Sequence, residues 1–452
     1  MGALSSGSAD RYRSREIVVV LGSSRRPSVP TALRSALVLA AAGGLALGGL
    51  SASAAPPPPP DPQLWVDPDS STIGHVEDLG LTGDARDDAL ALAGVPSATW
   101  FTGGTPREVK QDVKDVVVHA HADKAVPVLV AYNLPFRDCA QYSAGGATSL
   151  AEYTAWIDGF ARGIGNKQAV VILEPDGLGI IPWYTTVEGN QEWCRPAEAD
   201  PATAAAERFA MLNHAVDTLA ALPGTKVYLD AGNSKWLNVG DNADRLLKAG
   251  VERADGFFLN ASNYQYTENS EAYGRWISSC LALVTQAGGA FGDCGNQYWN
   301  GGPANDWSGV EMSHYGRWSA DATDPALSTA GVDSRYAEQL GDVRPTTSFV
   351  VDTSRNGQGP WDPATSENSY SDAEDWCNPP GRGLGLRPTL DTGEPLVDAY
   401  LWIKVPGESD GQCFRGTGGP LDPERGMVDP PAGQWFVEQA DELVELAVPA
   451  LG

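Results

Sequence analysis

The chain has 452 residues and a formal net charge of −27 at pH 7, with 42% apolar and 20% charged residues. The apolar and charged shares are typical of a globular protein, and the length suits one large α/β domain or two smaller ones. The acidic balance argues against nucleic acid and an anionic membrane surface as partners, and it suits a neutral substrate.

The first 55 residues have the features of an export signal. Arginines precede an apolar run over 36–50, and a small-residue cleavage site follows at 52–54. The run is too short and too rich in small residues to be a good membrane span. We therefore expect a secreted, extracellular protein with no membrane association once 1–55 are removed. A stiff proline-rich spacer would then occupy 56–60.

Six cysteines and five histidines occur in the chain. Export favours an oxidising compartment, so the cysteines predict three disulfides, although their spacing does not fix the pairing. The cysteines form no CxxC pair and the histidines show no metal-ligand spacing. We therefore expect neither a metal site nor a cofactor.

Helical and strand patterns alternate along 61–452, which we interpret as one catalytic domain. This alternation predicts an α/β fold in which parallel strands are joined by crossover helices. The expected helices are 85–93, 106–122, 149–163, 201–222 and 243–249. The expected strands are 97–101, 125–132, 169–173, 226–230, 256–260, 347–352 and 400–404.

The segment 265–343 interrupts the alternation. It is rich in Gly, Asn, Trp and Tyr and holds two cysteines. A loop of this length is usually functional or disordered, and the aromatic residues and the cysteine pair favour an ordered one. We expect a long insertion loop over the rim of the sheet, with a helix over 276–284.

A continuous apolar run over 169–173 ends in Glu174-Pro175-Asp176. The run is typical of a strand buried on both faces, and Pro175 cannot continue a central strand. Asp176 therefore lies just past the carboxyl end of a core strand, followed at once by apolar residues. Burial against them would raise its pKa, as a general acid requires. The alternative is a surface turn in which Asp176 caps the next helix.

Each predicted strand is followed by polar side chains. Because the carboxyl ends of parallel strands meet at one edge, these groups predict a functional cleft there, although any one of them could simply be solvated. The residues are Asn133, Asp138, Asp176, Asp230, Asn260, Asn263, Asp352, Arg355, Lys404, Glu408 and Asp410.

Seven segments in a fixed order resemble those of family 6 glycoside hydrolases. They read YNLPFRDCA at 132–140, LEPD at 173–176, YLDAG at 228–232, NASNY at 260–264, VDTSRNG at 351–357, EDWC at 374–377 and WIKVPGESDG at 402–411. The resemblance implies a secreted cellulase that hydrolyses β-1,4-glucan with inversion. It also implies a distorted seven-stranded parallel α/β barrel, with the active-site cleft at the carboxyl ends of the strands.

The same resemblance implies catalytic roles. Asp176 matches the proton donor, and Asp138 matches a second aspartate that raises the donor's pKa and helps to position water. Asp410 matches the position proposed for the base. Two close carboxyl groups do not both ionise readily, so Arg137 and Arg355 are expected to hold Asp138 ionised and leave Asp176 protonated. Inversion needs room for a water between base and sugar.

Substrate-binding and supporting residues also follow from the resemblance. Trp100, Trp236 and Trp376 match stacking platforms for glucosyl rings, and Tyr132 matches the tyrosine beside the distorted ring. The expected hydrogen-bonding groups are Asn260, Lys404 and Glu408, with Asp230 as a supporting residue and Asn233 where the family usually has a histidine. The implied disulfides are Cys139–Cys194 and Cys377–Cys413, which leaves Cys280 with Cys294.

The mode of action is the remaining question. The 132–146 segment and Val239, which stands where processive members of the family have an entrance tryptophan, resemble bacterial endoglucanases. The resemblance favours endo action on a β-1,4-glucan or cello-oligosaccharide. The first alternative is an exo-acting cellobiohydrolase in which 265–343 covers the cleft. The second is a non-hydrolytic glucan-binding protein on the same scaffold, suggested by Asn233 and Ala144. We expect a monomer.

Overall fold

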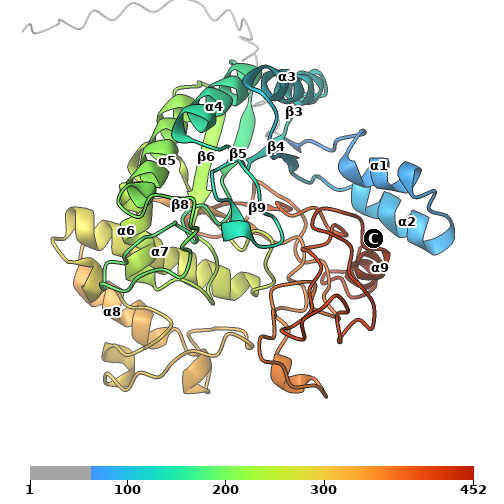
Figure 1. Cartoon of the computed structure of the whole chain (residues 1–452). Helices are drawn as coiled ribbons and strands as arrows, with labels where there is room; N and C mark the ends of the chain where they lie inside the picture. The colour runs from blue at the N-terminus through green and yellow to red at the C-terminus, as the bar shows by residue number, and fades with distance from the viewer. Residues whose placement is uncertain (1–62, 452) are drawn as a thin grey trace, which may run out of the picture. The chain divides into compact units, whose positions relative to one another are not determined.

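The computed structural model describes residues 63–451 (Figure 1). The predicted export signal and the proline-rich spacer lie outside the described residues. Among the helices within 63–451, none combines the length and apolar character that crossing a bilayer requires.

Seven parallel strands form the central sheet, in the order β2-β4-β5-β6-β7-β8-β9 (Figure 1). A backbone hydrogen bond of 2.9 Å from Ala98 N to Trp402 O brings the β2 end of the sheet against the segment after β9. The sheet thus curls into a distorted barrel, which confirms the predicted fold class. The strands are β2 (Thr99–Phe101), β4 (Val128–Ala131), β5 (Ala169–Leu173), β6 (Thr225–Asp230), β7 (Gly256–Leu259), β8 (Ser348–Asp352) and β9 (Val397–Leu401).

Alternate strand residues pack on opposite faces of the sheet, as the period of two dictates. On β5, Val170 and Ile172 face the barrel interior, where every strand from β4 to β9 contributes buried side chains. Val171 and Leu173 face outward into a larger core shared with the helices. Because both faces are buried, the strand reads as a continuous apolar run.

Helices connect the strands and cover the outer face of the sheet (Figure 1). The α3 helix begins with a capping box in which Thr105 and Glu108 exchange hydrogen bonds with each other's backbone N–H. The connecting helices are α3 (Pro106–Ala122), α4 (Leu150–Ile164), α5 (Ala204–Ala220), α6 (Val239–Lys248), α7 (Thr267–Gln286) and α8 (Ala330–Leu340).

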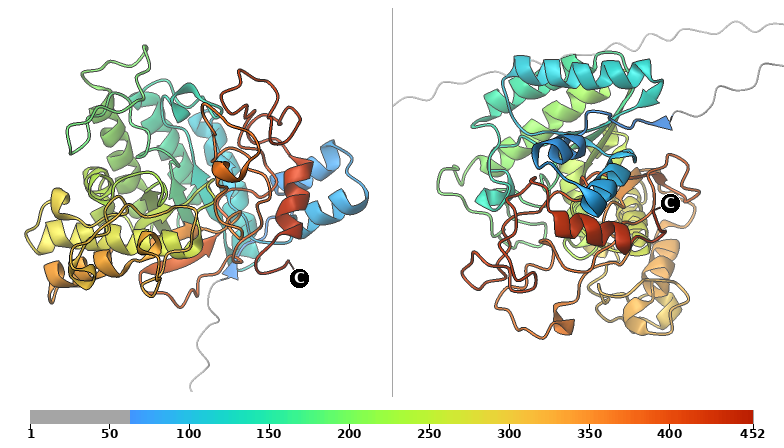
Figure 2. Two further views of the ribbon diagram at one scale, coloured as in Figure 1. Left: turned by 90° about the horizontal axis from the view of Figure 1, so that it is seen from below. Right: turned by 90° about the vertical axis from the view of Figure 1, so that its right-hand side faces the viewer.

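A smaller apolar cluster joins the beginning and the end of the described chain. Figure 2 shows α9 (Val437–Glu445) beside α1 (Ser71–Asp78) and α2 (Gly83–Ala93). The expected strand 125–132 is divided by Pro127, which lacks a backbone N–H. Its first part, β3 (Ala125–Val126), pairs with β1 (Gln63–Leu64), and its second part is β4.

Two predicted elements need correction. The segment 265–343 is not one long loop, because α7 and α8 occupy its two ends and the loop between them covers 287–329. The last strand covers Val397–Leu401 rather than 400–404. The backbone N–H groups of Ile403 and Lys404 donate to the Asp352 carboxylate instead of to a neighbouring strand.

Candidate active site

A cleft of about 710 Å³ lies among the loops that follow the strands. The loop positions follow from the parallel topology, which gathers the carboxyl ends of the strands at one end of the barrel. Most of the predicted site residues line it, namely Trp100, Tyr132, Arg137, Asp138, Asp176, Asn233, Trp236, Trp376, Lys404, Glu408 and Asp410.

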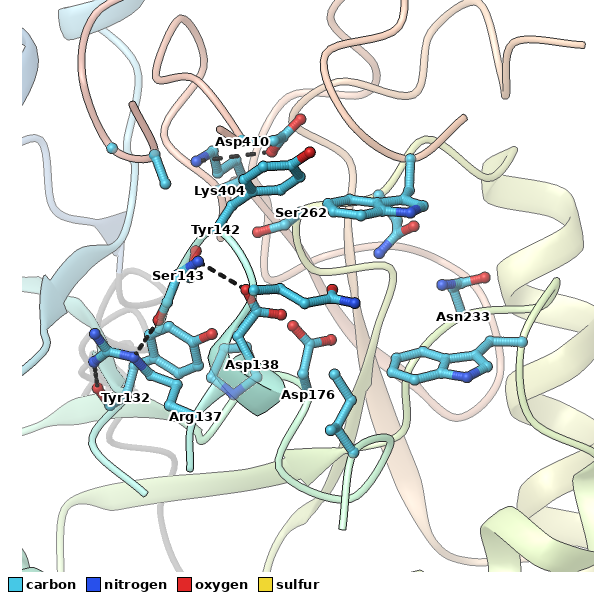
Figure 3. Close-up of a pocket in the computed structure, with 18 of the residues that line it drawn as sticks. Tyr132, Arg137, Asp138, Tyr142, Ser143, Asp176, Asn233, Ser262, Lys404 and Asp410 are labelled. Atoms are coloured by element: carbon cyan, nitrogen blue, oxygen red, sulfur yellow. Dashed lines mark hydrogen bonds and ion pairs between the residues drawn. The ribbon is translucent and has the colours of Figure 1, made fainter. Parts of the chain in front are cut away.

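Asp176 is the third residue after β5, and its carboxyl group points into the cleft (Figure 3). Burial raises its pKa well above the usual range, and the neighbouring carboxyl groups of Asp230 and Asp138 raise it further. A carboxyl group in this setting keeps its proton at a pH where an exposed aspartate is ionised. Asp230 raises the pKa of Asp176 more than Asp138 does, although the resemblance emphasised Asp138.

Asp138 lies on the loop after β4, and its carboxyl group points toward the same space as that of Asp176 (Figure 3). Its Oδ2 accepts a hydrogen bond of 2.7 Å from Ser143 N. Burial raises the pKa of Asp138, while this hydrogen bond and the Arg137 guanidinium lower it. The next residue, Cys139, forms a disulfide with Cys194 and so ties this loop to the one after β5.

Both aspartates occupy the left-handed region of the backbone, with φ of 55° at Asp138 and 62° at Asp176. This conformation is uncommon for residues other than glycine and persists where the surroundings impose it. One such constraint is the buried Arg208 of α5, whose guanidinium donates to Pro135 O in one loop and to Gly177 O and Ile180 O in the other. The sequence analysis missed Arg208, because an arginine inside a helical pattern gives no signal of its partners.

Glu174 and Asp230 hold the same two loops through their backbone. The Glu174 carboxylate accepts from the N–H groups of Asn133 and Leu134. The Asp230 carboxylate accepts from Leu178 and Gly179, at 3.1 Å each. Asp230 is 2% exposed and is not among the residues that line the cleft, so it contacts the site through the Leu178 and Gly179 backbone.

Asp410 has a different environment from the other two carboxyl groups. Arg355 binds both of its oxygens at 2.9 and 3.0 Å, and Oδ2 also accepts from Tyr264 Oη at 2.9 Å and from Asn378 N at 3.0 Å. Burial by itself raises the pKa of Asp410, but Arg355 and Lys404 outweigh it and hold the pKa below the usual value. Asp410 is therefore an ionised carboxylate whose oxygens are already engaged.

Two expectations about individual residues are not met. Arg355 pairs with Asp410 and not with Asp138, because the loop after β8 runs beside the 402–411 segment. Asn260 is fully buried, and its side chain bonds to the backbone of Gln265 and Asp352. It holds the loop after β7, while Ser262, Asn263 and Gln265 of that loop line the cleft.

The family model described as "Glycosyl hydrolases family 6" matches residues 60–447. The chain belongs to glycoside hydrolase family 6. It is therefore a glycoside hydrolase, with the distorted barrel of that family.

Relatives and solved structures agree with this assignment. Endoglucanase A of Thermobispora bispora is 33% identical over 87% of this chain and 67% of its own length. A fungal relative, "Probable 1,4-beta-D-glucan cellobiohydrolase C" of Aspergillus fumigatus, is 28% identical over 86% of this chain and 77% of its own. The endoglucanase Cel6 from Mycobacterium tuberculosis, solved with a methyl-cellobiosyl-thio-cellobioside, is 30% identical with a TM-score of 0.58, covering 85% of this chain and 97% of its own.

The family 6 cleft contains further residues that the sequence analysis missed. Trp193 is 51% exposed and lines the cleft. Trp236 and Trp376 line the same cleft. Lys235 and Asp375 form an ion pair at the rim, and Tyr315 of the 287–329 loop donates to Asp375 at 3.0 Å. Trp193 could have been found from its place next to Cys194, whereas the ion pair joins segments 140 residues apart.

All three disulfides of the described chain join the cysteine pairs that the resemblance implies. The Cys377–Cys413 bond lies beside Asn378, whose backbone holds Asp410. Within 63–451, Cys413, Asp422 and Asp429 form a group close enough together for a metal ion. Cys413 is in the disulfide and Asp422 is paired with Arg415, so this group offers no free set of ligands.

Proposed function

We propose that this family 6 enzyme hydrolyses β-1,4-glucosidic bonds in cellulose or a related β-glucan. The observation that carries the proposal is the Asp176 carboxyl group, whose pKa is raised by burial and by Asp230 and Asp138, in a cleft lined by tryptophans. Indole faces bind the apolar face of a sugar ring without needing charge, which suits a neutral polymer. The relatives named for endoglucanase and cellobiohydrolase activity support the same substrate class.

In the proposed reaction Asp176 gives its proton to the glycosidic oxygen as the bond to the anomeric carbon breaks. A water attacks that carbon from the opposite face, which inverts its configuration, and its proton passes to a carboxylate. Trp100 and Tyr132, which meet edge to face with ring centroids 5.4 Å apart, would hold the ring at the cleavage point. Lys404 and Glu408 would bind sugar hydroxyls.

We assign the base to Asp138 rather than to Asp410. Asp138 lines the cleft and its Oδ2 accepts from Ser143 N, whereas Arg355 binds both oxygens of Asp410 and Tyr264 and Asn378 also bind its Oδ2. A base works best when its pKa is near the working pH, and the pKa of Asp138 is raised by burial while that of Asp410 is lowered by Arg355 and Lys404. Asp410 would instead order the cleft wall through Arg355, Tyr264 and Asn378.

An Asp410→Asn variant tests this assignment of the base. The variant should keep the acid limb of the pH profile of kcat/KM, because that limb reports the ionisation of Asp138. Loss of the acid limb would show that Asp410 is the base.

We further propose endo action in an open cleft. None of the residues found to line the cleft belongs to the 287–329 loop, which supports an uncovered groove. Tyr298 and Tyr315 of that loop contact cleft residues only from outside the lining, by donating hydrogen bonds to Trp236 O and to the Asp375 carboxylate. Export by the 1–55 segment is part of the proposal, supported by the three disulfides.

The experiment compares wild type with Asp176→Asn on carboxymethylcellulose, following viscosity and reducing ends together. Wild type should lose viscosity early, while few reducing ends have formed. Asp176→Asn should lower kcat about 10²- to 10⁴-fold with substrate affinity retained. A slow loss of viscosity with steady release of cellobiose would contradict endo action. Formation of reducing ends at the background rate by both proteins would favour a non-hydrolytic glucan-binding protein.

A further inference from the structure

The 287–329 loop carries a pair of exposed tryptophans outside the cleft. Trp299 is 40% and Trp307 51% exposed, and their rings lie nearly parallel, with an interplanar angle of 20° and centroids 6.3 Å apart. Within the described range the other markedly exposed tryptophans are Trp193 and Trp376, and both line the cleft. Within the described residues, markedly exposed indoles therefore occur in the cleft and on the 287–329 loop. Substrate binding in the cleft accounts for the first group and not for the second.

The loop holds this pair in a fixed position. Asp306 and Trp307 both adopt left-handed backbone conformations, with φ of 49° and 60°, although neither is a glycine. The Trp307 N–H donates to Gly302 O at 2.9 Å, and the Asn305 side chain accepts from Gly302 N at 2.8 Å and donates to Asn300 O. A bulky residue in the left-handed region is a genuine outlier, and such strain is typical of functional sites.

The surroundings of Trp299 are shaped around its ring. A Cβ atom on Gly301 would lie 2.3 Å from the ring, and one on Gly309 2.5 Å, so both positions need glycine. The Arg335 guanidinium of α8 lies 5.9 Å from the centroids of both indoles. The pair is thus supported by the loop and α8 while a large part of both rings remains exposed. Such rigid aromatic groups bind at little entropic cost.

The pair is connected to the cleft by its neighbour. The hydroxyl of Tyr298 donates to Trp236 O at 2.5 Å, and Trp236 lines the cleft. Tyr298 is itself 38% exposed and precedes Trp299 directly. The segment that carries the tryptophan pair is thus hydrogen-bonded to a segment that lines the cleft. A polymer bound in the cleft can extend beyond it, whereas a short oligosaccharide cannot.

We propose that Trp299 and Trp307 form a second glucan-binding site, which holds a neutral β-glucan chain of the polymeric substrate outside the cleft. The inference rests on the proposed function for the identity of the ligand. A neutral polymer fits because the faces offered are apolar and the chain as a whole carries a net charge of −27, which disfavours anionic partners. The site would strengthen binding of polymers through two-point attachment.

The test is native-gel retardation by hydroxyethylcellulose, with the full chain carrying Asp176→Asn so that the polymer stays intact. Adding Trp299→Ala and Trp307→Ala should weaken the apparent affinity about tenfold or more, as expected for central tryptophans of a binding site. Adding Trp299→Phe and Trp307→Phe should restore part of it, which excludes a mere folding defect. The matched control is Leu79→Ala, which removes a 55% exposed apolar side chain from the C-cap of α1 and should change nothing.

Equal retardation with and without the two tryptophans would overturn the inference, and so would no retardation of any variant. A change of oligomeric state in sedimentation with unchanged retardation would overturn it too, as the pair would then be a contact between copies. Hydrolysis of the polymer by wild type is measured in parallel. If wild type hydrolyses the polymer but retardation does not depend on the two tryptophans, the proposed function holds and the second binding site is wrong. If retardation depends on the two tryptophans but wild type does not hydrolyse the polymer, the binding site holds and the proposed function is wrong.

Discussion

At Asp176, burial and the charges of Asp230 and Asp138 all act on the pKa in the same direction. This arrangement has a cost for folding. The unfolded chain releases the Asp176 proton near the ordinary pKa of 3.8, whereas the folded chain retains it to higher pH. Over that interval the unfolded state binds fewer protons, so the stability contributed at this position falls as the pH rises.

Replacing Asp176 by Asn should therefore stabilise the fold while lowering kcat. The gain in the free energy of unfolding should be small at pH 4 and should grow as the pH rises, until the folded-state carboxyl group would have ionised. Urea unfolding of wild type and variant across this range measures it.

The contrasting control is Asp410→Asn. The pKa of Asp410 is lowered in the folded chain, so its stabilisation is present above the unfolded-state pKa and is lost as the pH falls. Removing it leaves Arg355 buried without its partner, which should cost about 3–5 kcal/mol at neutral pH. A stability gain at Asp410, or none at Asp176, would contradict the assigned environments.

Individual site residues could be predicted where a motif fixes their place on a strand end. Asp176 follows a strand whose bounds were predicted correctly, and its acidic neighbour Asp138 lies in the next loop. Partners could not be predicted. The pairing of Arg355 with Asp410 and the burial of Asn260 depend on how three loops pack, which the local pattern does not encode.

Among the elements, α5 contacts both loops that carry the cleft aspartates Asp138 and Asp176. Its Arg208 is 2% exposed and binds backbone carbonyls from the loops that carry Asp138 and Asp176. Burial lowers the pKa of Arg208 to about 10, so the side chain is charged at neutral pH. One guanidinium thus links the loops that carry Asp138 and Asp176 to the same helix.

Arg208→Met should destabilise the fold by about 3 kcal/mol or more, because three buried carbonyl groups lose a charged donor. It should also lower kcat more than it raises KM, since the two aspartates shift while the stacking tryptophans stay in place. Chemical unfolding and steady-state kinetics measure both effects. Arg253→Met is the control: it removes a half-exposed surface pair with Asp217 and should cost less than about 1 kcal/mol. Similar losses from both variants would contradict the role of Arg208.

Strands and helices with a clear period were predictable, and connections were not. The apolar run of β5 and the amphipathic α3 were predicted with their observed bounds. The end of β9 was misplaced, because Asp352 accepts the N–H groups that would otherwise continue the strand. The helix α7 was recognised only in part, since its first turns carry polar residues that resemble a loop.

At the scale of the whole molecule, disulfides fix the loops that surround the cleft. Cys139–Cys194 joins the loops after β4 and β5, next to Asp138 and Trp193, and spans 55 residues. Cys280–Cys294 joins α7 to the loop after it and spans 14 residues, and neither cysteine lines the cleft. The two bonds therefore differ in their distance from the chemistry.

Removing each bond by paired Cys→Ser substitution separates stability from activity. Loss of chain-entropy restraint predicts about 4 kcal/mol for Cys139–Cys194 and about 3 kcal/mol for Cys280–Cys294. Activity per folded molecule should fall for the first pair and stay close to wild type for the second. Thermal unfolding and kcat, measured well below the melting temperature, give the two quantities. Equal activity of both variants would contradict the idea that the first bond positions Asp138.

The central claim is that Asp176 donates a proton to the leaving group, and leaving-group dependence tests it most directly. Asp176→Ala should hydrolyse cello-oligosaccharides about 10²- to 10⁴-fold more slowly than wild type. The same variant should cleave a dinitrophenyl β-cellotrioside at nearly the wild-type rate, because dinitrophenolate leaves without protonation. An equal loss of rate on both substrates would contradict the account.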